Sequence, residues 1–407
     1  MPKFFVDMHL HSKYSVATSE IMDLEHVSHY CRFKGLDIVA TGDVLHPRWL
    51  SELKNKLQEN EGLFSMRNER PMPFFILSGE ICTIYQLEGK RRRIHHVLLY
   101  PSFDSVEQAS DVLARHADLS SNGRPFVSLN PEDLVSLIRS VDDGIEVFPA
   151  HIWTPHFSIF GLHGHSSVEE AYGSNASRIH LMETGLSSDP EMNWSLSSLD
   201  RFKLVSNSDS HSPYPFRIGR EASLFELREP SYGSLLDAIR NGGASSLLMT
   251  VETFPQYGKY HWPGHRSCSF SASPEEYVRL AGLCPVCRRK LTNGVELEVR
   301  KKADRPRGYI PEGAKPFFRV IPLSEILSMI SGSPVDSTKV WNLYDGLVKR
   351  FGNEYSILLW APIRELDEIG GKRLGSLIRK MRQGTLEIRP GYDGKYGELI
   401  ETSNCCR

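Results

Sequence analysis

The stretch FVDMHLHSKYS, residues 5–15, indicates both the class of fold and the kind of site that it carries. An apolar run at residues 4–6 favours a strand, and Asp7, His9 and His11 then follow at every second position. In an extended chain, alternate residues point to the same face. The start of the chain therefore predicts a strand whose end presents three potential metal ligands.

Six further runs of the same kind follow before residue 250, namely LDIVATGD, FFILSGEI, HHVLLY, IEVFPAHI, IHLMETG and FKLVSNSD. Amphipathic stretches separate them, and this alternation is typical of α/β folds. In α/β barrels the catalytic groups gather at the carboxyl ends of the strands, and each of these runs carries a potential ligand. We therefore expect residues 1–250 to form a distorted (β/α)7 barrel with its ligands at one end.

The bulk composition describes a globular chain of two or three domains, with 407 residues, 40% hydrophobic and 24% charged. The net charge is only -2, but residues 255–320 hold 13 Lys and Arg against 6 Asp and Glu. This contrast indicates a basic module attached to an acidic remainder. No charged-then-apolar segment opens the chain and no apolar run could span a bilayer, so we expect a cytoplasmic protein without a membrane partner.

The basic module, residues 251–320, contains a second set of potential ligands, His265, Cys268, Cys284 and Cys287. Two ligand pairs joined by a turn are what a four-coordinate structural zinc requires, and the CPVC knuckle supplies one pair. His261 is an alternative to His265, which fits the spacing better. A redox CxxC is the competing interpretation, but Cys268 and the absence of a thioredoxin-like βαβ pattern count against it. We expect one structural zinc here.

Residues 321–407 show apolar residues at three and four spacing, which predicts a mainly helical C-terminal domain. The stretch LDEIGGKRLGSLIRK is similar to a helix-hairpin-helix, whose backbone amides bind a phosphate, although an ordinary helical turn is the alternative. A charge run is usually a solvated face. Grouped around a small zinc module, however, basic side chains favour contacts with the phosphates of a nucleic acid, and the candidates are Arg288, Arg289, Lys302, Arg305, Lys372 and Arg373.

Nine His, Asp and Glu residues of the first 250 form the expected metal centre: His9, His11, Asp43, His46, Glu80, His96, His151, Asp209 and His211. A set this large at successive strand ends indicates a polynuclear site with up to three divalent metals, Zn, Mn or Mg. Adjacent metals activate water and stabilise the oxygens of a phosphoester displacement. We expect phosphoester hydrolysis, with Asp209, Glu80 and His211 as the catalytic residues.

Residues 1–250 resemble the PHP (polymerase and histidinol phosphatase) superfamily, whose hallmark is HxH, an Asp-containing turn, a Glu, two separated histidines and a final DxH. The family's Thr-Asp-His triplet reads TGDVLH here. The resemblance implies one metal held by His9, His11, Glu80 and Asp209, a second by Glu80, His96 and His151, and a third by Asp43, His46 and His211. His95 competes with His96, which we favour because it directly precedes VLLY.

Over nearly its whole length the chain resembles the endonuclease Q family, through LMETGLSSDPEMNW, SNSDSHSP, the HR..C...CPVC...ADRP module and PGYDGKYGE in the tail. This resemblance implies a DNA repair endonuclease that cuts 5′ of a deaminated base (uracil, hypoxanthine or xanthine) or of an abasic site. The substrate would be damaged DNA, duplex or single-stranded, at the nucleoid. We find no clamp-binding peptide after Gly397.

Such an enzyme would extrude the lesion into a pocket, because a recessed metal centre does not reach a stacked nucleotide. Tyr14 and Trp153 are the candidates for stacking on the base, although packing is the commoner role of such residues. The main alternative function is a PHP-type phosphatase of a small phosphorylated metabolite, and the basic module argues against it. A non-catalytic DNA-binding protein is disfavoured because no ligand position is lost.

Overall fold

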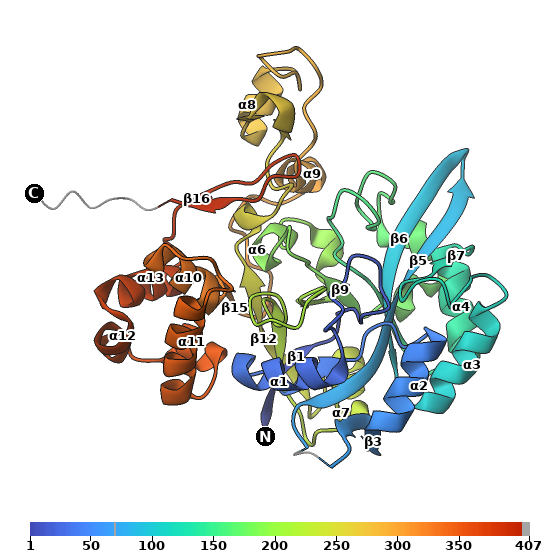
Figure 1. The fold of residues 1–407 in the computed structure, drawn as a ribbon. Coiled ribbons are helices and arrows are strands. Elements are labelled where there is room, and N and C mark those ends of the chain that lie inside the picture. Colours follow the sequence, from blue (N-terminus) through green and yellow to red (C-terminus); the bar gives the residue numbers. More distant parts are fainter. Residues whose placement is uncertain (69–70, 401–407) are drawn as a thin grey trace, which may run out of the picture.

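The computed structural model describes residues 1–68 and 71–400, so most of the tail examined for a clamp-binding peptide, residues 401–407, lies outside the described residues. All seven runs expected to be strands are strands. They are β1 (Lys3–Asp7), β2 (Ile38–Ala40), β5 (Phe74–Leu87), β6 (Lys90–Tyr100), β8 (Glu146–Pro149), β9 (Leu181–Glu183) and β10 (Lys203–Val205). The expected α/β class is confirmed (Figure 1).

Most strands belong to one sheet of eleven, in the order β15-β12-β11-β1-β2-β5-β4-β3, with β6 joining β5 to β8 and β7 pairing with β5. The other members are β3 (Leu57–Asn60), β4 (Leu63–Met66), β7 (Phe126–Val127), β11 (Ala222–Glu226), β12 (Ser246–Thr253) and β15 (Phe317–Val320). Strands β9 and β10 form a separate parallel pair.

Backbone hydrogen bonds bring the carboxyl ends of these strands together. The chain after β10 runs beside the chain after β1, where the amide of Asp209 donates to the carbonyl of His9 and the amide of His11 to that of Ser210, both at 2.9 Å. After β8, the amide of Ile152 donates to the carbonyl of Glu183 at 3.0 Å. The strand ends that carry the expected ligands therefore lie around one centre.

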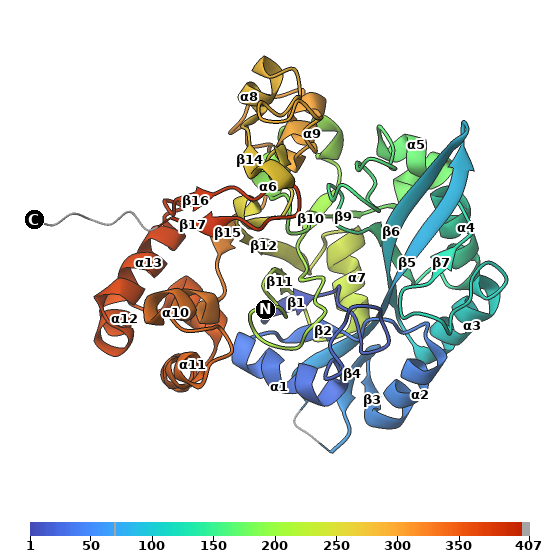
Figure 2. The same cartoon turned by 45° about the horizontal axis from the view of Figure 1, so that its top comes forward.

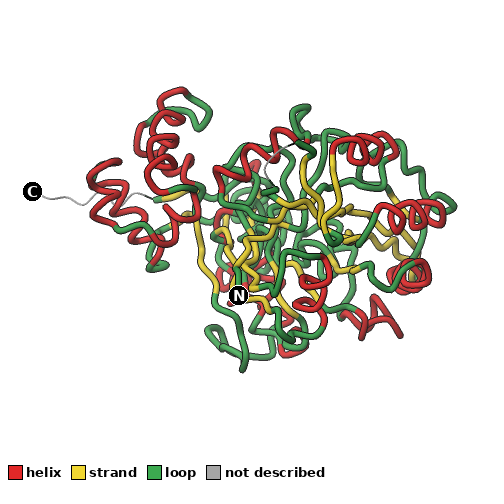
Figure 3. Tube along the Cα trace, turned by 90° about the horizontal axis from the view of Figure 1, so that it is seen from below, coloured by secondary structure: helices red, strands yellow, loops and turns green. Residues whose placement is uncertain are grey.

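Helices cover the strands from outside, and Figure 3 shows the strands in the middle of the larger part of the molecule. These helices are α1 (Leu24–Lys34), α2 (Pro47–Lys56), α3 (Phe103–Leu113), α4 (Pro131–Val141), α5 (Val168–Tyr172), α6 (Pro190–Asn193) and α7 (Tyr232–Arg240). In α4 the Asn130 side chain caps the start, and Leu134, Val135 and Ile138 lie on one buried face. Burying each such side chain stabilises the fold by roughly 1.5–3 kcal/mol.

The central segment, residues 254–316, forms a small unit beside the strand ends (Figure 2). It contains β13 (Gly264–His265), β14 (Phe270–Ser271), α8 (Pro274–Arg279) and α9 (Val295–Lys302). Part of it has a small core of its own around Ala272, Cys284 and Leu291, separate from the main core. The last strand pair of the chain, β16 (Ile388–Arg389) and β17 (Glu398–Leu399), returns to this segment, since the amide of Trp262 donates to the carbonyl of Gly391 at 3.0 Å.

The expected helical character of the C-terminal part is confirmed by α10 (Leu323–Ser331), α11 (Thr338–Phe351), a π-helix (Ser356–Trp360), α12 (Ile363–Gly370) and α13 (Lys372–Arg382). A buried ion pair fastens this helical group to α1. Lys34 Nζ lies 2.7 Å from Glu354 Oε1, and both side chains are fully buried. Glu354 also accepts from the Tyr344 hydroxyl and from the Leu323 amide. None of the helices in residues 1–68 and 71–400 is long and apolar enough to cross a membrane.

Candidate metal centre and nucleic-acid surface

The first group of potential ligands is His9, His11 and Asp209, whose ligand atoms all lie within 4.8 Å of one another. His9 and His11 follow β1 on one face, as their spacing predicts. Asp209 follows β10, and its Oδ1 lies 3.1 Å from His11 Nε2 and 3.7 Å from His9 Nε2. Asp209 has a φ of 45°, a left-handed conformation that Asp adopts more readily than most residues.

The second group is Glu80, His95 and His151, again with ligand atoms within 4.8 Å. Glu80 Oε1 lies 2.6 Å from His95 Nδ1 and 3.2 Å from His151 Nε2. The Glu80 carboxylate also lies 3.6 Å from the Nε2 atoms of both His9 and His11. Glu80 therefore lies between the two groups and would be shared by them if each held a metal ion.

The preference for His96 over His95 is wrong for this geometry. In the pairing of β5 with β6, His95 lies opposite Cys82 and His96 opposite Ile81, so His95 shares a face with Glu80 and His96 points to the other side. His96 is fully buried, and its ring nitrogens lie 3.0 Å from the Thr83 hydroxyl and 2.9 Å from the Tyr172 hydroxyl. His95 replaces it in the candidate site.

The third expected set, Asp43, His46 and His211, forms no such ligand group within the described part of the chain. Asp43 accepts hydrogen bonds from His11, Ser12 and Ser15. His46 donates through Nε2 to the carbonyl of Ser120 at 3.0 Å. The ring of His211 packs against that of His11 in a tilted arrangement, with 4.4 Å between the ring centroids. Asp43 and His211 therefore contact His11 of the first group and His46 does not, and the three side chains form no ligand group of their own in the described residues.

Three acidic or basic residues near the centre have roles that the sequence did not reveal. Glu183, at the end of β9, accepts from His9 Nδ1 at 3.0 Å, which leaves His9 Nε2 as the ligand atom. Arg124, on the loop between α3 and β7, donates to Glu80 at 3.2 Å. Asp7, expected as a third potential ligand beside His9 and His11, belongs to neither ligand group; its carboxylate accepts from the amides of Ser208 and Gly219 and so holds the neighbouring loop.

The charges of the site fit a cation. Burial lowers the pKa of His9 and His11, but the carboxylates of Glu183, Asp43, Asp209 and Glu80 outweigh it and raise these values to about 10 and about 9. Burial opposes ionisation of Glu80 and Asp209 too, yet the neighbouring cationic groups hold both pKa values well below their usual range. His9 Nε2 is buried without a hydrogen-bond partner and faces two carboxylates. A divalent metal would satisfy both the negative field and this unpaired atom.

The cysteine set of the central segment also converges. The ligand atoms of His265, Cys268, Cys284 and Cys287 lie within 4.8 Å of one another. The alternative, His261, instead lies 3.3 Å from Glu296 through Nε2. Burial raises the pKa of the Cys284 thiol, but hydrogen bonds from the backbone of residues 286 and 287 outweigh it and lower the value to about 7, which favours a thiolate ligand. Four such ligands suit one structural zinc.

Of the six expected phosphate-binding residues, Arg288, Arg289, Lys372 and Arg373 are exposed. Three of the six contact the protein itself: Arg305 is paired with Asp200, Lys302 Nζ donates to the carbonyl of Ser166, and Arg373 Nη1 donates to that of Ile330. Helices α12 and α13 are joined at Gly371, which has a φ of 83°, an arrangement that fits both the helix-hairpin-helix and an ordinary helical turn.

The two expected stacking residues are not free to receive a base. Trp153 is 2% exposed, donates to Asn193 and packs on Phe160. Tyr14 stacks on His46 and donates to Glu52. Both contacts support the packing interpretation.

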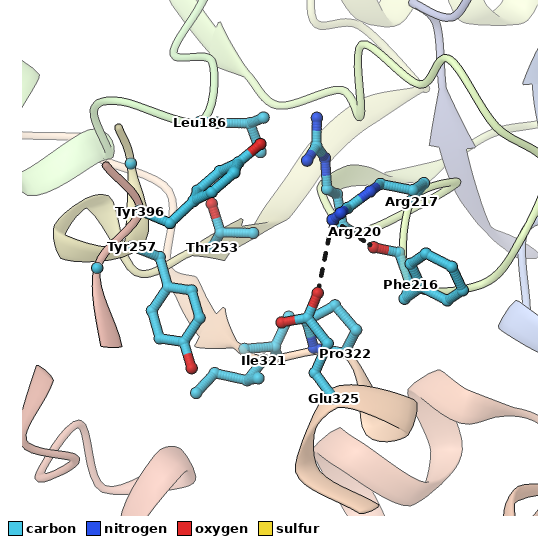
Figure 4. A pocket seen from close by; sticks show the side chains of 13 residues that line it. Leu186, Phe216, Arg217, Arg220, Thr253, Tyr257, Ile321, Pro322, Glu325 and Tyr396 are labelled. Atoms are coloured by element: carbon cyan, nitrogen blue, oxygen red, sulfur yellow. Dashed lines mark hydrogen bonds and ion pairs between the residues drawn. The ribbon is translucent and has the colours of Figure 1, made fainter. Parts of the chain in front are cut away.

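A different cavity, of about 250 Å³, lies where the strand domain, the central segment and the helical group meet (Figure 4). Tyr257, Tyr396 and Phe216 supply aromatic walls, and Arg217 lies 3.5 Å from Glu325 across it. Arg220, another wall residue, donates through Nε to the carbonyl of Ser208, the residue before Asp209. The cavity is therefore connected directly to the loop that carries a candidate metal ligand.

Comparison with known proteins gave matches over part and all of the chain. A family model described as the MJ0043 C-terminal domain matches residues 322–385. Protein MJ0043 of Methanocaldococcus jannaschii is 28% identical over 252 residues, which are 61% of this chain but only 31% of that protein. YqxK of Bacillus subtilis is 25% identical over 416 residues, covering 98% of this chain and 100% of YqxK.

Two solved structures match nearly the whole chain with a TM-score of 0.88. The lesion-specific endonuclease PfuEndoQ of Pyrococcus furiosus is 29% identical, with 99% of this chain and 96% of that chain covered. A complex of endonuclease Q with a 27-mer duplex, which carries an abasic lesion at the active site, is 30% identical, with 99% and 97% covered.

Proposed function

Since the chain belongs to the endonuclease Q family, we propose that it is a DNA repair endonuclease. It hydrolyses the phosphodiester 5′ of a deaminated base or of an abasic site, in the cytoplasm at the nucleoid. The observation that carries this proposal is the pair of ligand groups joined by Glu80, in a chain that is similar over its whole length to a protein solved with lesion-bearing DNA.

In this proposal residues 1–250 are a PHP-type distorted barrel, residues 251–320 a zinc-binding module and residues 321–407 a helical DNA-binding domain. The barrel would close through the backbone contacts that join the ends of β10 and β1 and of β8 and β9. The module and the helical domain would then flank the strand ends, where the metal centre lies.

The two ligand groups would hold one metal each, His9, His11 and Asp209 the first and His95 and His151 the second, with Glu80 between them. Bound divalent metals would activate water and stabilise the charge of the reacting phosphate oxygens. The chain's own contribution is orientation. Glu183 fixes the ring of His9, and Asp43 fixes the ring of His11, so that each Nε2 faces the centre.

We propose that the cavity of Figure 4, in place of Tyr14 and Trp153, receives the extruded base. Deamination replaces an exocyclic amine, a donor, with a carbonyl oxygen, an acceptor. The guanidinium of Arg220 and the hydroxyl of Thr253 line the cavity and supply donors for that oxygen. An undamaged cytosine or adenine would leave donor facing donor, which costs about 1–3 kcal/mol.

Nicking of a matched series of duplexes tests the function. One strand carries uracil, hypoxanthine, an abasic site, a mismatched cytosine or no lesion at the same position. We expect metal-dependent nicking 5′ of the first three, and nicking at the cytosine slower by about five- to 150-fold, the factors that correspond to 1 and 3 kcal/mol. Absence of nicking in every duplex, together with phosphatase activity on small phosphomonoesters, would favour the metabolite phosphatase.

A further inference from the structure

Arg124 lies beside the candidate metal ligands on a loop that backbone hydrogen bonds hold in place on both sides of it. The amide of Gly123 donates to the carbonyl of Tyr14 at 3.0 Å, and the amide of Cys82 donates to the carbonyl of Pro125 at 2.9 Å. A Cβ on Gly123 would lie 2.4 Å from the carboxylate of Asp43, so only glycine lets the backbone pass this close. Both neighbours of Arg124 are therefore fixed against parts of the chain that surround the ligands.

The guanidinium of Arg124 has donors left for a ligand. Within residues 1–68 and 71–400 it makes one hydrogen bond, from Nη1 to Glu80 Oε2, and its side chain is 23% exposed. Glu80 Oε1, in contrast, faces His95 and His151. One nitrogen of the guanidinium thus contacts the carboxylate between the ligand groups, and the side chain, though largely covered, keeps some exposed surface.

We propose that Arg124 is a catalytic residue that donates to the non-bridging oxygens of the scissile phosphate, an inference that rests on the proposed phosphodiester hydrolysis. In that reaction the oxygen of a water bonds to phosphorus, one phosphorus–oxygen ester bond breaks, and a proton of the water passes to the leaving alkoxide. Arg124 keeps its proton throughout. Its planar fork matches two phosphate oxygens, whose negative charge increases in the transition state.

The alternative role is structural, in which Arg124 only holds Glu80 in place. The variants Arg124→Gln and Arg124→Lys separate the two roles. Arg178→Gln is the matched control, because Arg178 precedes β9 and so lies at the end of that strand opposite the ligands. All proteins are loaded with Mn²⁺, and their metal content is measured. They are then compared on a duplex with one abasic site and on the small diester bis(p-nitrophenyl) phosphate.

If Arg124 is catalytic, both Arg124 variants should lose about 10²–10³-fold in single-turnover rate on both substrates. Their metal content should equal that of wild type. The Arg124→Lys variant should not recover the rate, because an ammonium group lacks the planar, two-pronged donor geometry of a guanidinium. In DNA binding, the slope of log affinity against log salt should fall by about 1 in Arg124→Gln and stay unchanged in Arg124→Lys. Arg178→Gln should nick at the wild-type rate.

Loss of a metal in Arg124→Gln, or a rate within a few-fold of wild type, would overturn the proposal. If wild type cleaves the diester but no lesion-bearing duplex, the DNA repair function fails, and the variants on the diester alone decide the role of Arg124. If the metal-loaded wild type cleaves neither substrate, both proposals are overturned.

Discussion

Replacing Lys34 by methionine removes one partner of the buried ion pair between α1 and the helical group. The Glu354 carboxylate would then keep its hydrogen bonds from Tyr344 and Leu323 but lose its counter-charge in a site without water contact. Breaking a buried pair in this way costs about 3–5 kcal/mol. Methionine is similar in length to lysine, so little of this loss should come from a cavity.

The assay is urea unfolding followed by tryptophan fluorescence, with Lys56→Met as the matched control. Lys56 is paired with Glu25 at 2.7 Å, but both side chains are exposed, and such a surface pair contributes at most about 1 kcal/mol. Adding Glu354→Gln to Lys34→Met should restore most of the stability, because the glutamine carbonyl still accepts from Leu323 and no charge remains buried. Equal losses in Lys34→Met and Lys56→Met would refute the reasoning.

Three further changes test the site and its supports. His95→Ala should lose metal and nick at least about 10²-fold more slowly, whereas His96→Ala should keep its metal. Metal analysis that finds the loss in His96→Ala and not in His95→Ala would restore His96 as the ligand. Cys284→Ser should release one zinc and weaken DNA binding before nicking chemistry is affected, and full zinc retention would contradict the structural site. Burial raises the pKa of Glu252 from 4.5 to about 7, so its contribution to stability is complete below pH 4.5 and is lost as the pH rises through 7. Glu252→Gln should therefore stabilise the protein more at pH 8 than at pH 4.5, and a pH-independent change in the urea midpoint would count against this.

The strands were predictable because each combines an apolar run with a ligand-type residue at its end, and this pattern is local. The alternation in residues 7–11 correctly placed His9 and His11 on one face. The choice between His95 and His96 was not predictable, because neighbouring residues of a strand point to opposite faces. Only the register of β6 on β5 decides which of the two shares the face of Glu80.

Contacts between residues far apart in the chain were also not predictable from the sequence. Arg305 belongs to a basic run that indicates a DNA surface, yet Asp200, more than a hundred residues earlier, binds its guanidinium. Arg124 lies in a loop without apolar period or motif, so nothing local distinguishes it from a solvated arginine. The neighbouring Gly123 is the best local signal, because a side chain at this position would collide with the Asp43 carboxylate. That collision is apparent only in the folded structure, where Asp43 lies next to Gly123.

The return of β16 and β17 to the central segment affects the order in which the protein is made. The amide of Trp262 donates to the carbonyl of Gly391, and the hydroxyl of Thr292 donates to Asp393. Neither bond can form until residues 391–393 have been made. Because a ribosome delivers the chain from its N-terminus, the strands of residues 1–250 can assemble while the central segment still lacks these contacts. The contacts that complete the surface of the central segment around Trp262 and Thr292 therefore form only after residues 391–393 have been made.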